Sequence, residues 1–162
     1  MFNVLNLFKK KEVVLTKEQK ICRQIERIYK LARIVANSKH LRVKTNAPGG
    51  HFYIRLNTAQ GDRVFNFTCS CFADYTSIRM CNPYKKGATE FDIVCDCIGS
   101  KVTDYILKVN STISPTSKNY VMSFNEIELA LYELETNLTR LHQEHVYHEE
   151  KHTKLLRLEL KK

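Results

Sequence analysis

Hydrophobic and polar positions along the chain follow two different periods. Between residues 17 and 37, apolar side chains such as Ile21, Ile25 and Ile28 recur at every third or fourth position. This spacing places them on one face of an α-helix. Thr16 and Gln19 fit a capping box immediately before the segment, because each side chain satisfies a free backbone N–H at the helix start. The pattern therefore predicts an N-terminal amphipathic helix.

After Ser38 the period changes to two, the spacing of half-buried β-strands. Leu41 and Val43 alternate with charged residues, and Phe52, Ile54 and Leu56 do the same beyond a glycine-rich turn. Further strands are predicted around residues 65–71, 76–81 and 91–97, each bounded by turn-forming residues. Short consecutive strands of this kind favour an antiparallel β-meander of four to five strands. The spacing of apolar residues from 100 to 109 predicts a short helix.

The last segment is predicted to form one long helix from about Ser123 to the C-terminus. It contains no glycine and no proline, so no residue is expected to end it early. A helix of some 37 residues is about 55 Å long, whereas a small domain is about 30 Å across. We therefore expect an α+β fold with a basic α+β domain at 1–122 and a long helix at 123–162. Only the first half of this helix is expected to pack on the domain.

This terminal helix carries a heptad seam, with spacings of four and three residues typical of helix-on-helix packing. Its members are Ile127, Leu131, Leu134, Leu138, Leu141, His145, His148, His152 and Leu155. Two interpretations stay open: the first half packs on the chain's own sheet, or the seam binds a second helix. The part proposed to bind another helix comprises Leu134, Leu138, Leu141, His145, His148, His152 and Leu155.

The seam histidines His145, His148 and His152 have three interpretations. They are interface residues whose protonation loosens packing, weak candidate ligands for a metal such as zinc, or solvated residues without a role. The segment His148-Glu-Glu-Lys-His152 also resembles the five-residue signature of zinc proteases. Its neighbours are charged, whereas the helix behind such a metal site is apolar, so no catalytic residue, metal or cofactor is predicted.

Two Cys-x-Cys pairs, Cys69/Cys71 and Cys95/Cys97, have the composition of a four-cysteine zinc site. In a strand, residues two apart share one face, and these cysteines continue the face that carries Phe65, Phe67, Phe91 and Ile93. Free cysteine behaves as a small hydrophobic residue. Core packing is therefore the favoured interpretation, with zinc binding as the alternative.

Positive charge is concentrated at one end of the chain. Residues 1–46 contain 12 Lys and Arg against 3 acidic residues, whereas residues 123–162 contain 6 against 8. Such asymmetry favours an anionic partner at the basic end. The candidate nucleic-acid-binding residues lie on the N-terminal arm, the first helix and the first hairpin: Lys9, Lys10, Lys11, Lys17, Lys20, Arg23, Arg27, Lys30, Arg42, Lys44, Tyr53 and Arg55.

These patterns together predict a non-enzymatic binding or assembly protein. Its basic surface would contact nucleic acid or a nucleoprotein, and its C-terminal helix would form a homodimer. The second hypothesis is an inhibitor or adaptor that docks on a larger protein that handles nucleic acid, and a remote third is a zinc-dependent hydrolase. No apolar run of about 18 residues is present, so no transmembrane segment is expected. Six cysteines without an export signal favour a cytoplasmic location.

Overall fold

The computed structural model describes residues 14–46, 50–70, 75–84, 89–97, 105–110 and 124–162 of the chain. Within these ranges it is an α+β protein, as the sequence predicts. The elements, in chain order, are α1 (Lys17–Ala36), β1 (Lys44–Thr45), β2 (His51–Thr58), β3 (Gly61–Ser70), β4 (Tyr75–Cys81), β5 (Thr89–Cys97), β6 (Tyr105–Asn110) and α2 (Phe124–Leu160).

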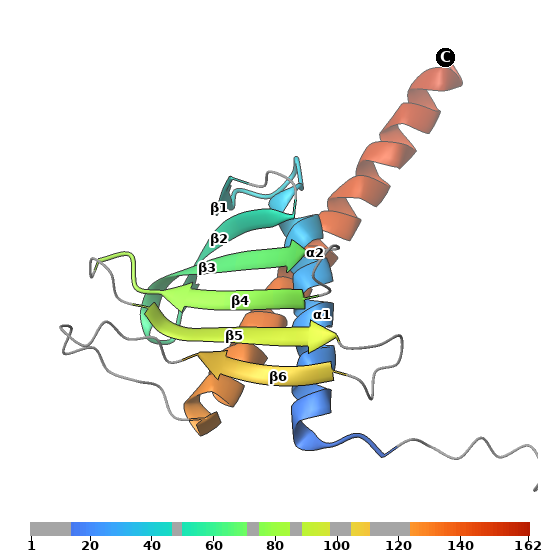
Figure 1. The fold of residues 1–162 in the computed structure, drawn as a ribbon. Coiled ribbons are helices and arrows are strands. Elements are labelled where there is room, and N and C mark those ends of the chain that lie inside the picture. The colour runs from blue at the N-terminus through green and yellow to red at the C-terminus, as the bar shows by residue number, and fades with distance from the viewer. Residues whose placement is uncertain (1–13, 47–49, 71–74, 85–88, 98–104, 111–123) are drawn as a thin grey trace, which may run out of the picture.

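The strands form one antiparallel sheet in the order β1-β2-β3-β4-β5-β6, so each strand pairs with its neighbour in sequence (Figure 1). Gly61 helps to close the β2–β3 hairpin, because it adopts a φ of 98° that other residues rarely tolerate. The register places large apolar side chains of four strands opposite one another in two rows. These rows are Phe52–Phe67–Ile78–Ile93 and Ile54–Phe65–Met80–Phe91.

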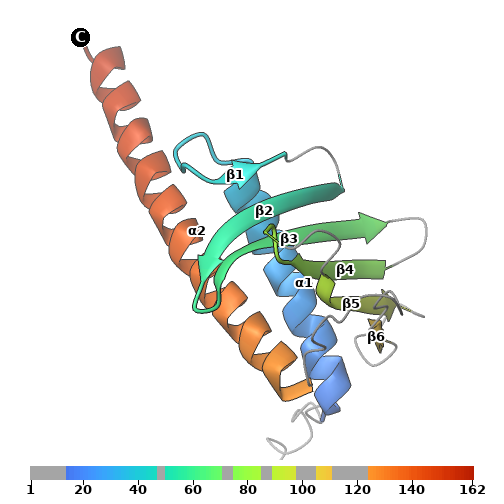
Figure 2. The same ribbon diagram turned by 90° about the vertical axis from the view of Figure 1, so that its left-hand side faces the viewer.

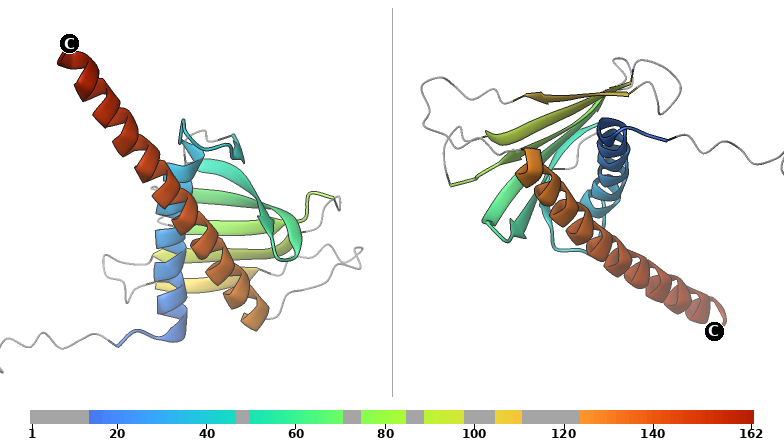
Figure 3. Two further views of the ribbon diagram at one scale, coloured as in Figure 1. Left: turned by 180° about the vertical axis from the view of Figure 1, so that it is seen from behind. Right: turned by 90° about the horizontal axis from the view of Figure 1, so that it is seen from below.

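Both helices lie on the same face of the sheet, and the described residues place no helix on the opposite face (Figures 2 and 3). The apolar side of α1 and the first half of α2 cover the two rows. Ile25 and Ile28 of α1 are fully buried, as are Leu131 and Leu138 of α2. The helices and the sheet therefore enclose a single hydrophobic core.

The predicted capping box is present at the start of α1. The backbone N–H of Gln19 donates to Thr16 Oγ1 at 3.2 Å, and that of Thr16 donates to Gln19 Oε1 at 3.0 Å. Both bonds satisfy donors that the first turn of a helix leaves free. The boundary predicted from sequence is confirmed.

The short helix predicted for residues 100–109 is wrong over its described part, because residues 105–110 form β6. Ile106 and Val109 have the spacing of a helix face, but they are β-branched and therefore also favour a strand. Pairing with β5, in which Ile106 lies opposite Asp96 and Val109 opposite Ile93, decides between the two. Within the described residues the sheet consequently has six strands, whereas the sequence predicts four to five.

The C-terminal helix is continuous over 37 residues. Its first half belongs to the core up to Leu141, whereas every side chain from residue 151 onward is exposed. Figures 1 and 3 show the second half running out beyond the body. None of the helices in the described ranges is both long and apolar enough to span a membrane.

Leu134 is 1% exposed and packs in the shared core, so replacing it tests the role of α2 in stability. We expect Leu134→Ala to lower the free energy of unfolding by about 2–5 kcal/mol, because it leaves a cavity. Leu129→Ala is the matched control: Leu129 lies on the same helix but is 68% exposed. Urea unfolding should show a change of less than about 0.5 kcal/mol for the control. Equal losses in both variants would contradict this account.

Candidate functional site

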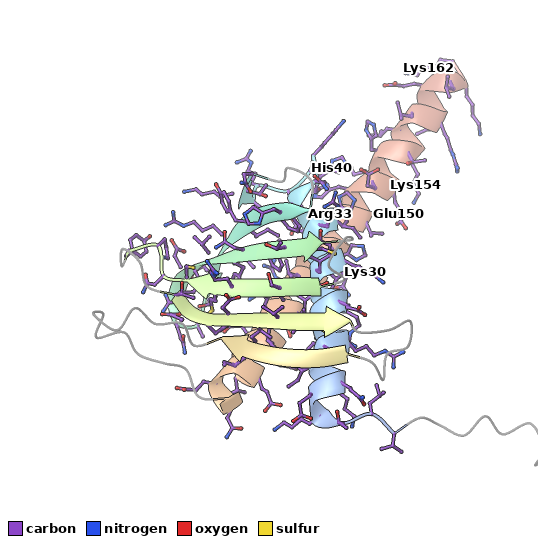
Figure 4. All side chains as sticks on the ribbon, viewed as in Figure 1. Lys30, Arg33, His40, Glu150, Lys154 and Lys162 are labelled. Carbon is purple, nitrogen blue, oxygen red and sulfur yellow. The ribbon has the colours of Figure 1, made fainter. Side chains whose placement is uncertain are left out.

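A basic face runs along the solvent side of α1. Lys20, Arg23, Arg27 and Lys30 are exposed, whereas the opposite side of the helix is buried in the core. Figure 4 shows Lys30 and Arg33 along this helix. Helical spacing aligns the four exposed cations on one side, as the sequence predicts.

Part of this basic face is engaged by α2. Arg27 Nε donates to Glu135 Oε1 at 3.1 Å, and Gln24 Nε2 donates to Glu135 Oε2 at 2.8 Å. Lys17 Nζ lies 3.3 Å from Glu128 Oε2. These contacts join the two helices above the core and offset two of the predicted cations. Among the residues that the structure describes, Lys20, Arg23 and Lys30 form no ion pair.

The predicted nucleic-acid residues do not form one continuous surface. Tyr53 and Arg55 alternate with the buried Phe52 and Ile54 on β2, so they lie on the sheet face opposite α1 and α2. The basic residues of α1 lie on the other side of the molecule. Arg42 and Lys44 are exposed at β1 and just before it. The predicted residues Lys9, Lys10 and Lys11 lie outside the described residues.

Arg55 is part of a polar cluster on the open sheet face. Its Nη2 donates to Asp62 Oδ2 at 3.0 Å and to the Tyr84 hydroxyl at 2.9 Å, and this hydroxyl donates to Asp62 Oδ2 at 2.8 Å. The guanidinium also lies over the Tyr84 ring. Hydrogen bonds from Tyr84 and Arg55 lower the pKa of the Asp62 carboxyl, and the bond to Asp62 raises the pKa of Arg55. Arg55 is therefore already paired with an acid of its own chain.

A histidine cluster lies where α2 leaves the body. The structure brings His40, from the connection after α1, beside the three predicted seam histidines. Its ring centroid is 5.9 Å from that of His145, 5.7 Å from that of His148 and 6.2 Å from that of His152. In Figure 4, His40 lies beside the base of the projecting part of α2.

Two polar contacts hold this connection against α2. Ser38 Oγ and His145 Nδ1 are 2.7 Å apart, and His40 Nε2 lies 3.0 Å from Glu149 Oε1. The backbone N–H of His40 also donates to Ser38 Oγ at 3.2 Å. His40 is not among the predicted site residues, because no spacing rule relates it to a helix that begins more than 80 residues later. The only hint in the sequence is that His40 follows shortly after the predicted end of the first helix.

The predicted seam is divided by this arrangement. Leu134, Leu138 and Leu141 are buried in the chain's own core, while His145 and His148 are half-buried beside the histidine cluster. The remaining two seam residues, His152 and Leu155, are exposed. Packing within the chain therefore accounts for the first half of the seam. In the second half, the three histidines lie beside His40, and Leu155 is exposed.

The zinc hypotheses gain no geometric support. Within the described residues, no group of three or more His, Cys, Asp or Glu residues is arranged to hold a metal ion. Glu149, the first glutamate of the HEEKH segment, lies 3.0 Å from His40 Nε2 through its Oε1.

Of the Cys-x-Cys residues, Cys95 is buried as predicted for core packing. Cys69 is exposed instead. Its neighbours across the sheet are Gly50, which has no side chain, and Thr76. Cys71 lies outside the described residues, as does the side chain of Cys97.

Comparison of the chain with protein-family models, with curated proteins and with solved structures found no significant match. Any functional conclusion therefore depends on the surfaces described above.

The Asp62 cluster predicts a pH effect with a definite sign. Because the pKa of Asp62 is lowered in the folded state, its ionised form stabilises the fold above the unfolded-state pKa. This contribution is lost as pH falls through the lowered value. Tyr84→Phe removes the largest cause, so we expect the Asp62 pKa to rise and the acid-sensitive stability to decrease. NMR titration of the Asp62 carboxyl in the wild type and in Tyr84→Phe measures this change in pKa. Tyr53→Phe is the control. A wild-type Asp62 that titrates at its usual value would refute the cluster.

The contact between His40 and α2 predicts local protection of the helix. His40→Ala should speed amide hydrogen exchange of residues 145–149, by up to about fivefold, because a partly exposed polar contact contributes up to about 1 kcal/mol. His142→Ala is the control, since His142 lies on the same helix outside the cluster. The idea fails if both variants exchange as the wild type does.

Proposed function

We propose that the protein is a non-enzymatic nucleic-acid-binding and assembly protein that contacts phosphates through the basic face of α1. The observation that carries the proposal is the set of exposed cations without ion pairs among the described residues, Lys20, Arg23 and Lys30. A helix that fixes cations in a row forms a surface complementary to a charged backbone.

The dimensions of this face suit contact with several phosphates. Lys20 and Lys30 are ten residues apart, which corresponds to about 15 Å along a helix. Duplex DNA carries one negative charge per about 1.7 Å of its axis. Contacts of this type position a protein on nucleic acid without reading base sequence. The proposed binding is therefore independent of sequence. Contact of Tyr53 and Arg55 with nucleic acid stays a separate prediction.

Assembly is the second part of the proposal, and it concerns the projecting half of α2. Leu155, Leu156, Leu158 and Leu160 are all exposed there. Apolar side chains gathered on one projecting element mark an interaction site. A homodimer would present two copies of the basic face to one nucleic acid, which raises the overall affinity through multivalency.

The same exposed leucines favour a second candidate function, an adaptor that docks on a larger protein. An adaptor differs from the first proposal in what it binds: it needs no direct affinity for nucleic acid. It would co-purify with one protein at a fixed stoichiometry.

Salt dependence tests the proposed phosphate contacts. Fluorescence anisotropy with labelled single- and double-stranded oligonucleotides should show binding that weakens steeply between about 50 and 200 mM salt. Arg23→Gln/Lys30→Gln should weaken binding to all sequences alike and reduce the slope of log K against log salt by about two.

The control variant Arg157→Gln/Lys161→Gln removes the same net charge near the far end of α2. It should leave the slope unchanged if α1 makes the contacts. Absence of binding at low salt would refute the proposal, and equal effects of the two double variants would exclude the basic face of α1 as the site.

A further inference from the structure

Charge is segregated along the projecting part of α2. Residues 144–150 include three glutamates, Glu144, Glu149 and Glu150, and no lysine or arginine. Residues 151–162 include five lysines and arginines against a single glutamate, Glu159. Figure 4 shows Glu150 near the base of the projection, Lys154 beyond it and Lys162 at its end. The two halves therefore carry opposite net charges.

One side of this projection carries a second stripe, which diverges from the seam facing His40 and shares only His148 and Leu155 with it. At 100° per residue, one stripe follows the spacing 4-3-4-3-4 along the helix. Its members are Glu144, His148, Lys151, Leu155, Leu158 and Lys162. The turn continues past Leu160, because Lys161 N donates to Leu158 O and Lys162 N to Glu159 O, both at 3.3 Å. Alternating spacings of four and three residues are the pattern of a helix that packs on another helix.

The stripe is accessible in the described structure. All its members are exposed except His148, which is half-buried. Leu155 is 53% exposed and Leu158 is 60% exposed. Among the residues that the structure describes, one ion pair involves the stripe: Arg140 Nη1 and Glu144 Oε2 lie 3.9 Å apart, and both side chains are about half exposed or more. Such a pair contributes little to stability, so it does not prevent Glu144 from binding a different cation.

We propose that this stripe binds the same stripe of a second copy of the chain in antiparallel orientation. The proposal rests on the self-association proposed above and adds its orientation, register and contact residues. Antiparallel packing sets the acidic half of one helix against the basic half of the other. Parallel packing would set like charges together, which is unfavourable. The opposed helix dipoles also favour the antiparallel pair.

The stripe defines one register for this pair. A two-fold axis near Thr153 places Glu144 opposite Lys162 of the second copy. It also places His148 opposite Leu158 and Lys151 opposite Leu155 of the second copy, and symmetry repeats each contact. The stem of Lys151 packs on leucine while its ammonium group reaches solvent. The interface is self-complementary and closed, so it ends at a dimer.

The apolar layers are tested by two leucines in the same helical turn. Leu158→Asp should weaken dimerisation at least tenfold, because it removes an apolar side chain from each half of the interface and desolvates a carboxylate in its place. Leu160→Asp is the matched control: Leu160 is 87% exposed and lies on the opposite side of the helix. Sedimentation equilibrium of the full-length chain over a range of concentrations measures both variants.

The register is tested by exchanging one pair of charges. Glu144→Lys and Lys162→Glu should each weaken the homodimer by about tenfold, since each creates two like-charge contacts. The double variant Glu144→Lys/Lys162→Glu should restore wild-type affinity. A mixture of the two single variants should form a heterodimer, because each contact then joins opposite charges.

The outcomes separate this proposal from the proposed function. A wild-type chain that stays monomeric at all concentrations overturns self-association and this pairing together, but leaves nucleic-acid binding to its own salt test. A dimer that ignores the single charge changes overturns the antiparallel register while self-association stands. A dimer sensitive to Leu160→Asp instead of Leu158→Asp places the interface on the other side of the helix and overturns the stripe.

Discussion

Burial of one face of the β-sheet is the constraint on which the other features depend. The phenylalanine and isoleucine rows of β2 to β5 are covered by two helices from opposite ends of the chain. Removing apolar surface from water is the dominant favourable term in folding. It fixes which side of α1 faces solvent, and so where its cations lie. It also fixes which half of α2 is held against the body and which half is left to project.

Elements whose local pattern and tertiary environment agree were predictable from the sequence. The capping box at Thr16, the start of α1, the alternation on β2 and the length of α2 are of this kind. β6 is the exception among the elements, because Ile106 and Val109 fit a helix face and a strand equally well. The choice depends on β5, whose free edge is available to pair with this segment. A single sequence does not show that this edge is available.

The candidate surfaces were less predictable than the fold, for two physical reasons. Periodicity assigns Arg27 and Arg55 to polar faces, but it does not reveal that Glu135 and Asp62 pair with them there. It also cannot bring together residues that are distant in sequence. His40 joins three histidines of α2 only because α1 ends where that helix leaves the sheet. Polar faces follow from the sequence, whereas their partners follow from the packing.

The packing of α1 against α2 also has a consequence for the order of folding. The ion pair between Arg27 and Glu135 links residues 108 positions apart. A ribosome therefore completes α1 and all six strands before the helix that closes the core has been made. Long-range contacts of this kind slow folding, and until then part of the phenylalanine-rich sheet face is exposed. We therefore expect a chain truncated before α2 to expose this apolar sheet face and to aggregate more readily than the full chain.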